Sequence, residues 1–483
     1  MHDRELHDLL EKLVALPKET EWVEFKCNNN DPEEIGKRLS AVANGACLHR
    51  QANGYLVFGV EDGTHRIVGT DFHPKSARKG GEELEHWLAT RLNPRIDFRI
   101  FEFACENATV ALFEVPAAHD RPVKFLHKAY IRVGSITRDL GEFPDKEKKI
   151  WQIRPGSSFE TDIALGGINA DEVLNLLDYP GYFDLMKLPL PTNRDAILEK
   201  LCGEKLVVKE CSKYHITNLG GILFAKNLNS FEGLARKAPR VIIYEGKNRI
   251  KTVKDLTGTK GYAVGFEGLI DYINDKLPSN EEIKRAFRET VRMYPEIAIR
   301  ELVANALIHQ DFHETGAGPT IEIFDDRLEI TNPGRPIITT MRFIDEFQSR
   351  NEKLASLLRR VGVCEEQGSG IDKVIFHIEL FQLPAPEFIE TERHTKVVLH
   401  SFQPLNEMDR KDKVRACYQH ACLKYVSNEQ MTNQSLRERF KIEDHNYSIA
   451  SRIIADTIDA GLVKSYDPEN LSKKHARYIP IWA

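Results

Sequence analysis

The sequence ETEWVEFK at residues 19–26, answered by GVEDG at residues 59–63, decides how the first part of the chain folds and what it can bind. Glu19 and Glu24 lie five residues apart, and Asp62 follows an apolar run of strand length. Hard divalent cations prefer oxygen ligands and keep several waters, so two or three carboxylates can hold one. Such a metal lowers the pKa of a bound water and neutralises charge on a scissile phosphate. Glu19, Glu24 and Asp62 are therefore candidate ligands for Mg²⁺ or Mn²⁺.

Lys26 adds a positive charge beside these carboxylates. It lies two positions after Glu24 along an expected strand, so both side chains face the same side of the sheet, and Lys26 could contact the same phosphate. Spacing alone favours a plainer interpretation, in which a solvent-exposed strand edge is followed by a turn aspartate.

The composition of the 483 residues limits the class of protein. Hydrophobic residues make up 41% and charged residues 29%, as in an ordinary soluble globular protein of two to four domains. The sequence has no run of eighteen apolar residues and no signal-peptide pattern, so we expect a cytoplasmic protein without a membrane span. The eight cysteines form no Cys-x-x-Cys pair, which argues against a disulfide framework or a zinc site. A net charge of −6 excludes a uniformly basic surface for nucleic acid but permits local basic patches.

Helix and strand patterns alternate through the first 155 residues. We expect helices over residues 3–16, 31–47 and 83–91, and strands over residues 23–26, 55–60, 96–103, 108–115 and 130–135. This order predicts an α/β domain with a mixed sheet. A linker, Arg154-Pro155-Gly156-Ser157-Ser158, follows it.

Four separated motifs in this domain resemble the Schlafen AlbA-like domain. They are Pro17-x-Glu19-x-x-x-x-Glu24-Phe25-Lys26, Ser40-Ala41-x-Ala43-Asn44, Gly54-x-Leu56-x-Phe58-Gly59-Val60-x-Asp62-Gly63 and Tyr130-x-Arg132-x-Gly134-Ser135. The resemblance implies metal-dependent cleavage of structured RNA such as tRNA, as in the nuclease members of the family. Glu19, Glu24, Lys26 and Asp62 would be the catalytic positions, and Arg132 would contact nucleic acid.

The same resemblance leaves other roles open. Many bacterial relatives are known only as nucleic-acid-binding or transcriptional proteins. The best-understood members pair two such lobes, so this chain would need a homodimer or a higher homo-oligomer to build the equivalent.

Residues 156–284 are expected to form a connecting α/β region. A helix at 195–201, a strand at 206–209 and the turn Thr217-Asn218-Leu219-Gly220-Gly221 fit a small winged-helix-like element. A connector packed between lobes fits them equally well.

A second group of polar residues follows the helix expected to begin at Tyr294-Pro295. Glu301, Asn305 and His309 recur at successive turns along one edge of that helix, which suits a polar ligand lying across it. Later, Gly368-Ser369-Gly370 leads into another helix, whose free N–H groups could bind phosphate. A plain helix entry explains this short glycine motif more simply.

Taken together, four motifs resemble the GHKL ATPase family, and more narrowly its divergent ATP-binding branch found behind Schlafen AlbA-like domains. They are Glu301-x-x-x-Asn305-Ala306-x-x-His309, Asn332-Pro333-Gly334, Arg350-Asn351 and Gly368-Ser369-Gly370. The resemblance implies a GHKL-like α/β sandwich that binds ATP and Mg²⁺. Asn305 would coordinate the Mg²⁺ on the phosphates, Glu301 would position or activate water, and Gly368 and Gly370 would belong to a lid.

One position in this set departs from the family. Asn332 stands where the family places an aspartate against the adenine amine. The amide oxygen of asparagine can accept the same hydrogen bond but carries no charge. Affinity and base specificity therefore need not follow the family, while Gly334 still lets the backbone approach the ligand.

The last 75 residues have the order of a winged helix. We expect helices at 409–426, 432–440 and 448–460, followed by strands at 462–465 and 478–481. Lys473, Lys474 and Arg477 place positive charge on the expected wing and predict contact with nucleic acid. A winged helix can also serve only in dimerisation.

We therefore expect an α/β multidomain protein. The predicted domains are a mixed-sheet Schlafen AlbA-like lobe (1–155), the connecting region (156–284), the GHKL-like domain (285–402) and a winged helix (403–483).

The first hypothesis for function is an ATP-regulated, metal-dependent endonuclease with weak ATPase activity, acting on RNA rather than DNA. Its role in stress response or phage defence rests on family analogy. The alternative is a non-catalytic, nucleotide-sensing, DNA-binding transcriptional regulator. A third is a scaffold filament or assembly factor that uses nucleotide only for ordering.

Overall fold

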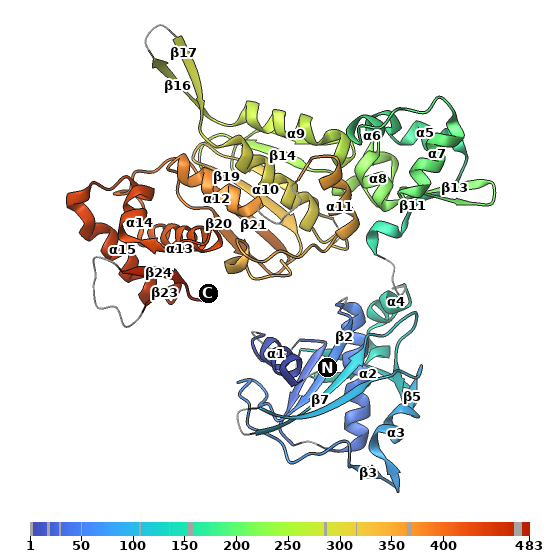
Figure 1. The fold of residues 1–483 in the computed structure, drawn as a ribbon. Helices are drawn as coiled ribbons and strands as arrows, with labels where there is room; N and C mark the ends of the chain where they lie inside the picture. The colour runs from blue at the N-terminus through green and yellow to red at the C-terminus, as the bar shows by residue number, and fades with distance from the viewer. Residues whose placement is uncertain are drawn as a thin grey trace. The chain divides into compact units, whose positions relative to one another are not determined.

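The chain folds into two compact units, residues 1–157 and 158–483, each with its own hydrophobic cores (Figure 1). This computed structural model describes residues 3–16, 20–28, 30–49, 51–105, 108–134, 136–152, 158–284, 287–314, 316–364, 370–467 and 476–483. None of the helices in these ranges is long and apolar enough to cross a membrane.

Unit 1 alternates helices and strands as the sequence predicts. Its elements are α1 (Asp3–Val14), β1 (Val23–Lys26), α2 (Pro32–Leu48), β2 (Asn53–Phe58), β3 (Arg78–Lys79), β4 (Glu82–Glu83), α3 (Leu84–Ala89), β5 (Leu92–Asn93), β6 (Arg99–Cys105), β7 (Ala108–Pro116), β8 (Lys124–Phe125), β9 (Lys128–Val133), β10 (Ile136–Asp139), η1 (Leu140–Glu142) and α4 (Pro144–Gln152).

A mixed sheet of order β1-β2-β7-β6 lies between two helices of unit 1. β1 runs parallel to β2, and the remaining pairs are antiparallel. Alternate residues of β2 face opposite sides, so Val57 packs with α1 while Leu56 and Phe58 pack with α2. Both faces of the sheet are therefore buried.

α2 also packs against a second sheet of order β10-β9-β8-β5, and it is buried along most of its length. A small residue permits this close packing: a Cβ on Gly36 would lie 2.2 Å from the ring of Phe125 on β8. The buried amide of Asn44 donates to the carbonyl oxygens of Val123 and Tyr130 at 2.9 and 2.8 Å and accepts from the Val123 N–H at 2.8 Å. The Ser40–Asn44 motif thus fastens α2 to the second sheet.

Unit 2 contains the remaining elements. They are η2 (Phe159–Thr161), β11 (Ile163–Ile168), α5 (Ala170–Leu176), α6 (Tyr179–Leu185), α7 (Arg194–Gly203), β12 (Val207–Glu210), β13 (Lys213–Thr217), α8 (Asn218–Phe224), η3 (Leu228–Ser230), η4 (Ala235–Lys237), β14 (Arg240–Tyr244), β15 (Thr252–Thr257), α9 (Tyr262–Lys276), β16 (Ser279–Lys284), β17 (Phe287–Arg292), α10 (Glu296–His309), β18 (Thr320–Ile323), β19 (Arg327–Pro333), η5 (Thr340–Arg342), α11 (Glu352–Arg360), α12 (Gly370–Leu380), β20 (Glu387–Glu390), β21 (His394–His400), α13 (Arg410–Val426), β22 (Met431–Thr432), α14 (Asn433–Phe440), η6 (Asp444–Asn446), α15 (Tyr447–Asp459), β23 (Val463–Ser465) and β24 (Arg477–Pro480).

A six-stranded sheet of order β15-β14-β18-β19-β21-β20 forms the centre of unit 2. α10 packs against both β19 and α12, and the core they share extends from Val173 to Leu399 (Figure 1). β14 pairs in parallel with β18, so β14 and β15 belong to this sheet. The boundary predicted at residue 284 therefore needs correction, because the chain from residue 240 onward already contributes strands to the sheet.

Two smaller elements flank the large sheet. Strands β11, β13 and β12 form a three-stranded antiparallel sheet in the same segment as α5, α6 and α7, within the predicted connecting region. At the other end, α13, β22, α14, α15, β23 and β24 follow one another with sheet order β22-β24-β23, the order expected of a winged helix. The side chain of Thr432 caps α14 by accepting from the Ser435 N–H at 3.0 Å.

Candidate functional site

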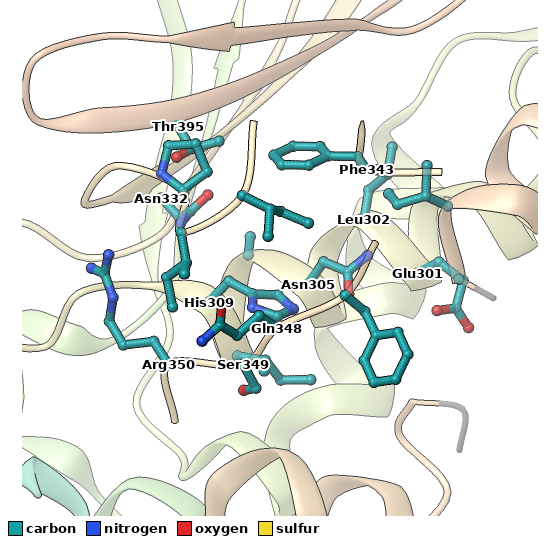
Figure 2. A pocket seen from close by; sticks show the side chains of 18 of the residues that line it. Glu301, Leu302, Asn305, His309, Asn332, Phe343, Gln348, Ser349, Arg350 and Thr395 are labelled. Carbon is teal, nitrogen blue, oxygen red and sulfur yellow. The ribbon is translucent and has the colours of Figure 1, made fainter. Parts of the chain in front are cut away.

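A large pocket lies between α10, α12 and the strands β19, β20 and β21 of unit 2 (Figure 2). It contains about 1260 Å³ of empty space, open solvent at its mouth included. Its polar lining includes Glu301, Asn305, His309, Asn332, Ser349 and Thr395, and its apolar lining includes Ile330, Pro336, Ile337, Phe343, Phe388 and Val397.

α10 gives the pocket its long axis. The helix begins after Pro295, which serves as its N-cap and has no N–H to satisfy, and its apolar side is buried. Glu301, Asn305 and His309 then recur every fourth residue, so each lies about 6 Å along the axis from the next. Figure 2 places Glu301 at one side of the pocket, with Asn305 and His309 following toward the other. All three residues, which the sequence analysis proposed for a ligand, line this pocket.

The Glu301 end of the pocket meets the start of α12. A Cβ added to Gly370, the first residue of α12, would lie 2.7 Å from Glu301 Oε2 and 3.7 Å from Asn305 Nδ2. Unpaired N–H groups and the helix dipole make such a helix start favourable for an anion, such as a phosphate group. The other predicted glycine of this loop, Gly368, lies outside the described residues.

His309 is held neutral within the pocket. Burial lowers its pKa to about 4, and the positive charge of Arg350 lowers the pKa further in the same direction. Arg350 forms an ion pair with Asp311 at 2.8 Å and donates to the carbonyl oxygen of Arg335 at 2.8 Å. A neutral imidazole at this position can offer a ligand one donor and one acceptor.

Asn332 and Thr395 lie side by side at the opposite end of the pocket from Glu301 (Figure 2). They face each other across the β19–β21 pair, and the Thr395 hydroxyl donates to the carbonyl oxygen of Gly334 at 2.9 Å. Gly334 has φ +98°, and a Cβ there would lie 2.6 Å from the Asp311 side chain. Glycine is therefore required at this turn.

Several polar side chains of this pocket have no hydrogen-bond partner within the described part of the chain. Ser349 Oγ is buried without one, and none is found for the side chains of Asn305, His309 and Asn332, of which Asn332 is only 8% exposed. Buried polar groups are normally paired, because an unpaired one loses its hydration without compensation. The pocket is thus suited to a ligand that offers many hydrogen bonds.

Sequence reasoning missed some lining residues and gave no separate role to others. Thr395 and Ser349 carry no motif of their own, and Thr395 becomes recognisable only through its pairing with Asn332. Asn351, in contrast, is structural: its amide donates to the carbonyl oxygens of Ile308 and Gln310 at 2.7 and 2.9 Å and so caps the end of α10.

The predicted metal site in unit 1 has a different arrangement. Glu24 is buried, and cations surround its carboxylate: Oε1 lies 3.1 Å from Arg38 Nε and 3.2 Å from Lys26 Nζ. Oε2 lies 2.5 Å from Arg132 Nη1, a close ion pair without the alignment of a hydrogen bond. These cations surround the carboxylate that the sequence predicts as a metal ligand, so a metal would have to displace at least one of them.

The other members of the predicted triad do not complete it in this structure. Asp62 has a half-exposed side chain and lies 3.5 Å from Lys26 Nζ. Glu19 lies outside the described residues. Within the ranges that the structure describes, no group of three or more His, Cys, Asp or Glu side chains is arranged to hold a metal.

Arg132 requires a further correction. The sequence analysis assigned it to nucleic acid, but its side chain is fully buried and faces Glu24, while its Nε donates to the carbonyl oxygen of Thr20 at 3.3 Å. A phosphate cannot reach a guanidinium in this position. Arg132 instead links β9 to β1 and to the segment before it.

The predicted wing is described only in part. Lys473 and Lys474 lie outside the described residues. Arg477 is exposed on β24, and its guanidinium lies 4.8 Å from the ring centre of Tyr466. Arg452 adds a second exposed cation, on α15.

Comparison with known proteins identifies two domains. The family model "Schlafen, AlbA_2" matches residues 19–141, and the model "Putative ATP-dependent DNA helicase recG C-terminal" matches residues 316–399. None of the curated proteins gives a match.

Two solved structures are similar to the chain at low identity. The DIP2311 protein from Corynebacterium diphtheriae is 16% identical, with a TM-score of 0.43 over 99% of this chain and 97% of that one. The N-terminal domain of a RecG-related protein from Nitrosomonas europaea is 23% identical, with a TM-score of 0.18 over 27% of this chain and 90% of that one. Both scores are too low to indicate a shared fold for the whole chain.

Proposed function

We propose that this chain, a Schlafen AlbA-like protein with an ATPase-type domain, binds ATP with Mg²⁺ in the pocket of unit 2 and uses the bound nucleotide to control its binding of nucleic acid. The observation that carries the proposal is a set of polar side chains in one pocket, Asn305, His309, Asn332 and Ser349. The described part of the chain offers them no hydrogen-bond partner, and the Ser349 hydroxyl is buried. A nucleotide supplies hydrogen-bonding groups along its whole length and could satisfy all of them.

The two ends of the pocket suit the two ends of a nucleotide. Glu301 and Asn305 meet the start of α12, where phosphates would lie, while Ile330 and Val397 flank the Asn332 end, where a flat base would pack. The amide oxygen of Asn305 is the type of hard oxygen ligand that Mg²⁺ accepts. A bound Mg²⁺ would neutralise phosphate charge, so Asn305 is the residue that we expect to hold it.

Calorimetric titration of the full chain with ATP and Mg²⁺ tests this site. We expect binding in the wild type, at least tenfold weaker binding in Asn305→Ala, and no change in Asn229→Ala, which removes an exposed asparagine elsewhere in unit 2. If both variants bind ATP like the wild type, the pocket has been assigned wrongly.

A buried polar connection supports control of nucleic acid by the pocket. α12 begins at Gly370 beside the pocket, and its penultimate residue, Glu379, lies 2.9 Å from His420 Nδ1 on α13. His420 Nε2 in turn lies 3.1 Å from Ser435 Oγ, which belongs to the capping box of α14. Glu379 also lies 3.4 Å from the buried Nε of Arg439 on α14. A movement of α12 on nucleotide binding would therefore reach two helices of the winged helix directly.

Measuring nucleic-acid affinity with and without ATP tests this connection. Couplings between sites typically change affinity by roughly 5–150-fold. Glu379→Gln should retain ATP binding. The logarithm of the ratio of its Kd values for duplex DNA with and without ATP should be less than half that of the wild type. Glu390→Gln, on the exposed end of β20, is the matched control. An unchanged coupling in Glu379→Gln would rule out this route.

Metal-dependent cleavage is a second candidate, and one contact favours it. Lys26 Nζ lies within 3.5 Å of both Glu24 and Asp62, so one cation already bridges two of the predicted ligands, and a divalent ion could replace it. Wild-type protein with Mg²⁺ or Mn²⁺ would then cut tRNA, Asp62→Asn would not, and the neighbouring Glu61→Gln would cut normally. Cleavage by Asp62→Asn at the wild-type rate would remove this candidate.

A further inference from the structure

Asn332 is the polar side chain best placed to read a nucleobase. It lies near the end of β19, lines the pocket opposite Glu301, and is only 8% exposed (Figure 2). Its backbone pairs with Thr395, but its side-chain amide forms no hydrogen bond within the described residues. An amide that faces a cavity, and that has no partner among the described residues, can complete its hydrogen bonds with a ligand group.

The neighbours of Asn332 limit what that group can be. Ile330, Pro336 and Val397 provide apolar surface for the faces of a flat ring, and the phosphate end lies at the far side of the pocket. Thr395 already donates its hydroxyl proton to Gly334, so it offers this end of the pocket only an acceptor. The edge of a purine, including an exocyclic amine, fits this combination.

A carboxamide cannot distinguish the two common purines as a carboxylate does. Adenine presents an amine donor beside a ring-nitrogen acceptor, whereas guanine presents a carbonyl acceptor beside a ring N–H donor. An asparagine side chain carries one acceptor oxygen and an NH₂ group with two donor hydrogens. Rotating the amide by 180° exchanges the two groups, so the side chain can pair with either edge. Because none of the described residues holds the Asn332 amide in one orientation, this turn breaks no hydrogen bond among them.

We propose that the pocket binds ATP and GTP with similar affinity and that Asn332 is the residue responsible. This inference rests on the proposed nucleotide-binding function and names the ligand class more closely. With the ring held in one position, a carboxylate at position 332 would accept from the adenine amine but would face the guanine carbonyl. Guanine could then pair with it only by shifting to present its ring N–H and its amine. Loss of a required hydrogen bond at a buried polar site is the kind of change that produces strong discrimination.

The test is calorimetric titration of the full chain with ATP or GTP in the presence of Mg²⁺. In the wild type we expect the two Kd values to agree within fivefold. In Asn332→Asp the Kd for GTP should rise at least tenfold more than the Kd for ATP. Gln348→Glu adds the same charge at the exposed rim of the pocket, so it should weaken both nucleotides alike.

Each outcome decides between this inference and the function on which it rests. If ATP binds and GTP binds more than fivefold more weakly in the wild type, the proposed function stands and the dual specificity is wrong. If neither nucleotide binds, both are wrong. If Asn332→Asp weakens ATP and GTP equally, another residue reads the base. The ratio of the wild-type Kd values for GTP and ATP tests the dual specificity even if Asn332→Asp does not fold.

Discussion

Replacing Arg132 with methionine tests the most unexpected contact in unit 1. The substitution removes a fully buried guanidinium that lies 2.5 Å from Glu24, and it also removes the hydrogen bond to Thr20. Removing one partner of a buried ion pair typically costs 3–5 kcal/mol, because the other charge remains buried. Arg38 and Lys26 still face Glu24, so we expect the lower end, about 3 kcal/mol.

The assay is thermal unfolding followed by tryptophan fluorescence. Three of the four tryptophans, Trp22, Trp87 and Trp151, belong to unit 1, so this signal reports mainly on that unit. A loss of about 3 kcal/mol should lower the Tm of unit 1 by roughly 6–12 °C, given 2–4 °C per kcal/mol for a domain of this size.

A double substitution tests whether Glu24 and Arg132 stabilise the fold as a pair or independently of each other. Glu24→Leu with Arg132→Met removes both charges, so it should cost clearly less than the sum of the two single substitutions. A decrease in Tm below about 2 °C for Arg132→Met, together with loss of nucleic-acid binding, would refute the buried position and restore Arg132 as a surface contact.

Other perturbations give equally definite results. Saturating ATP at 100-fold its Kd should stabilise unit 2 by about 2.7 kcal/mol and leave the unit 1 transition unmoved, as differential scanning calorimetry would show. Since the folded state holds His309 neutral with its pKa lowered to about 4, stability should fall as pH decreases from about 6.5 toward 4. His309→Asn should lose roughly 3 kcal/mol of that pH dependence in denaturant titrations, and an unchanged dependence would contradict the burial. Gly370→Val, whose Cβ would meet Glu301 at 2.7 Å, should abolish ATP binding without unfolding unit 2. Thr432→Ala should cost about 1 kcal/mol through loss of the α14 cap and weaken DNA binding measured by fluorescence anisotropy; unaltered affinity would separate the winged helix from DNA.

The sequence predicted the elements well wherever local chemistry determines them. Strand β1 has the expected bounds, and Asp31, Asp409 and Thr432 cap helices where a short polar side chain precedes an apolar pattern. Periodicity also placed Glu301, Asn305 and His309 on one helix edge, because four residues complete about one turn.

What the sequence could not predict depends on partners that are distant along the chain. Glu24 and Arg132 are 108 positions apart, and nothing local in either one indicates that they would neutralise each other inside the fold. The parallel pairing of β14 with β18 crosses 76 residues, so the large sheet begins well before the predicted domain boundary. Thr395 joins the pocket only through its register with Asn332. Side-chain periodicity carries no information about such pairings.

The ion pairs around Glu24 also change what the presence of this glutamate in related sequences would mean. Selection for folding alone is sufficient to preserve Glu24 and Arg132, and a substitution at one position creates pressure for a matching change at the other. A lineage can therefore lose cleavage, or never possess it, and still keep this glutamate. Among related sequences, the informative residue is the exposed Asp62, because the stability of the fold gives it little protection from replacement.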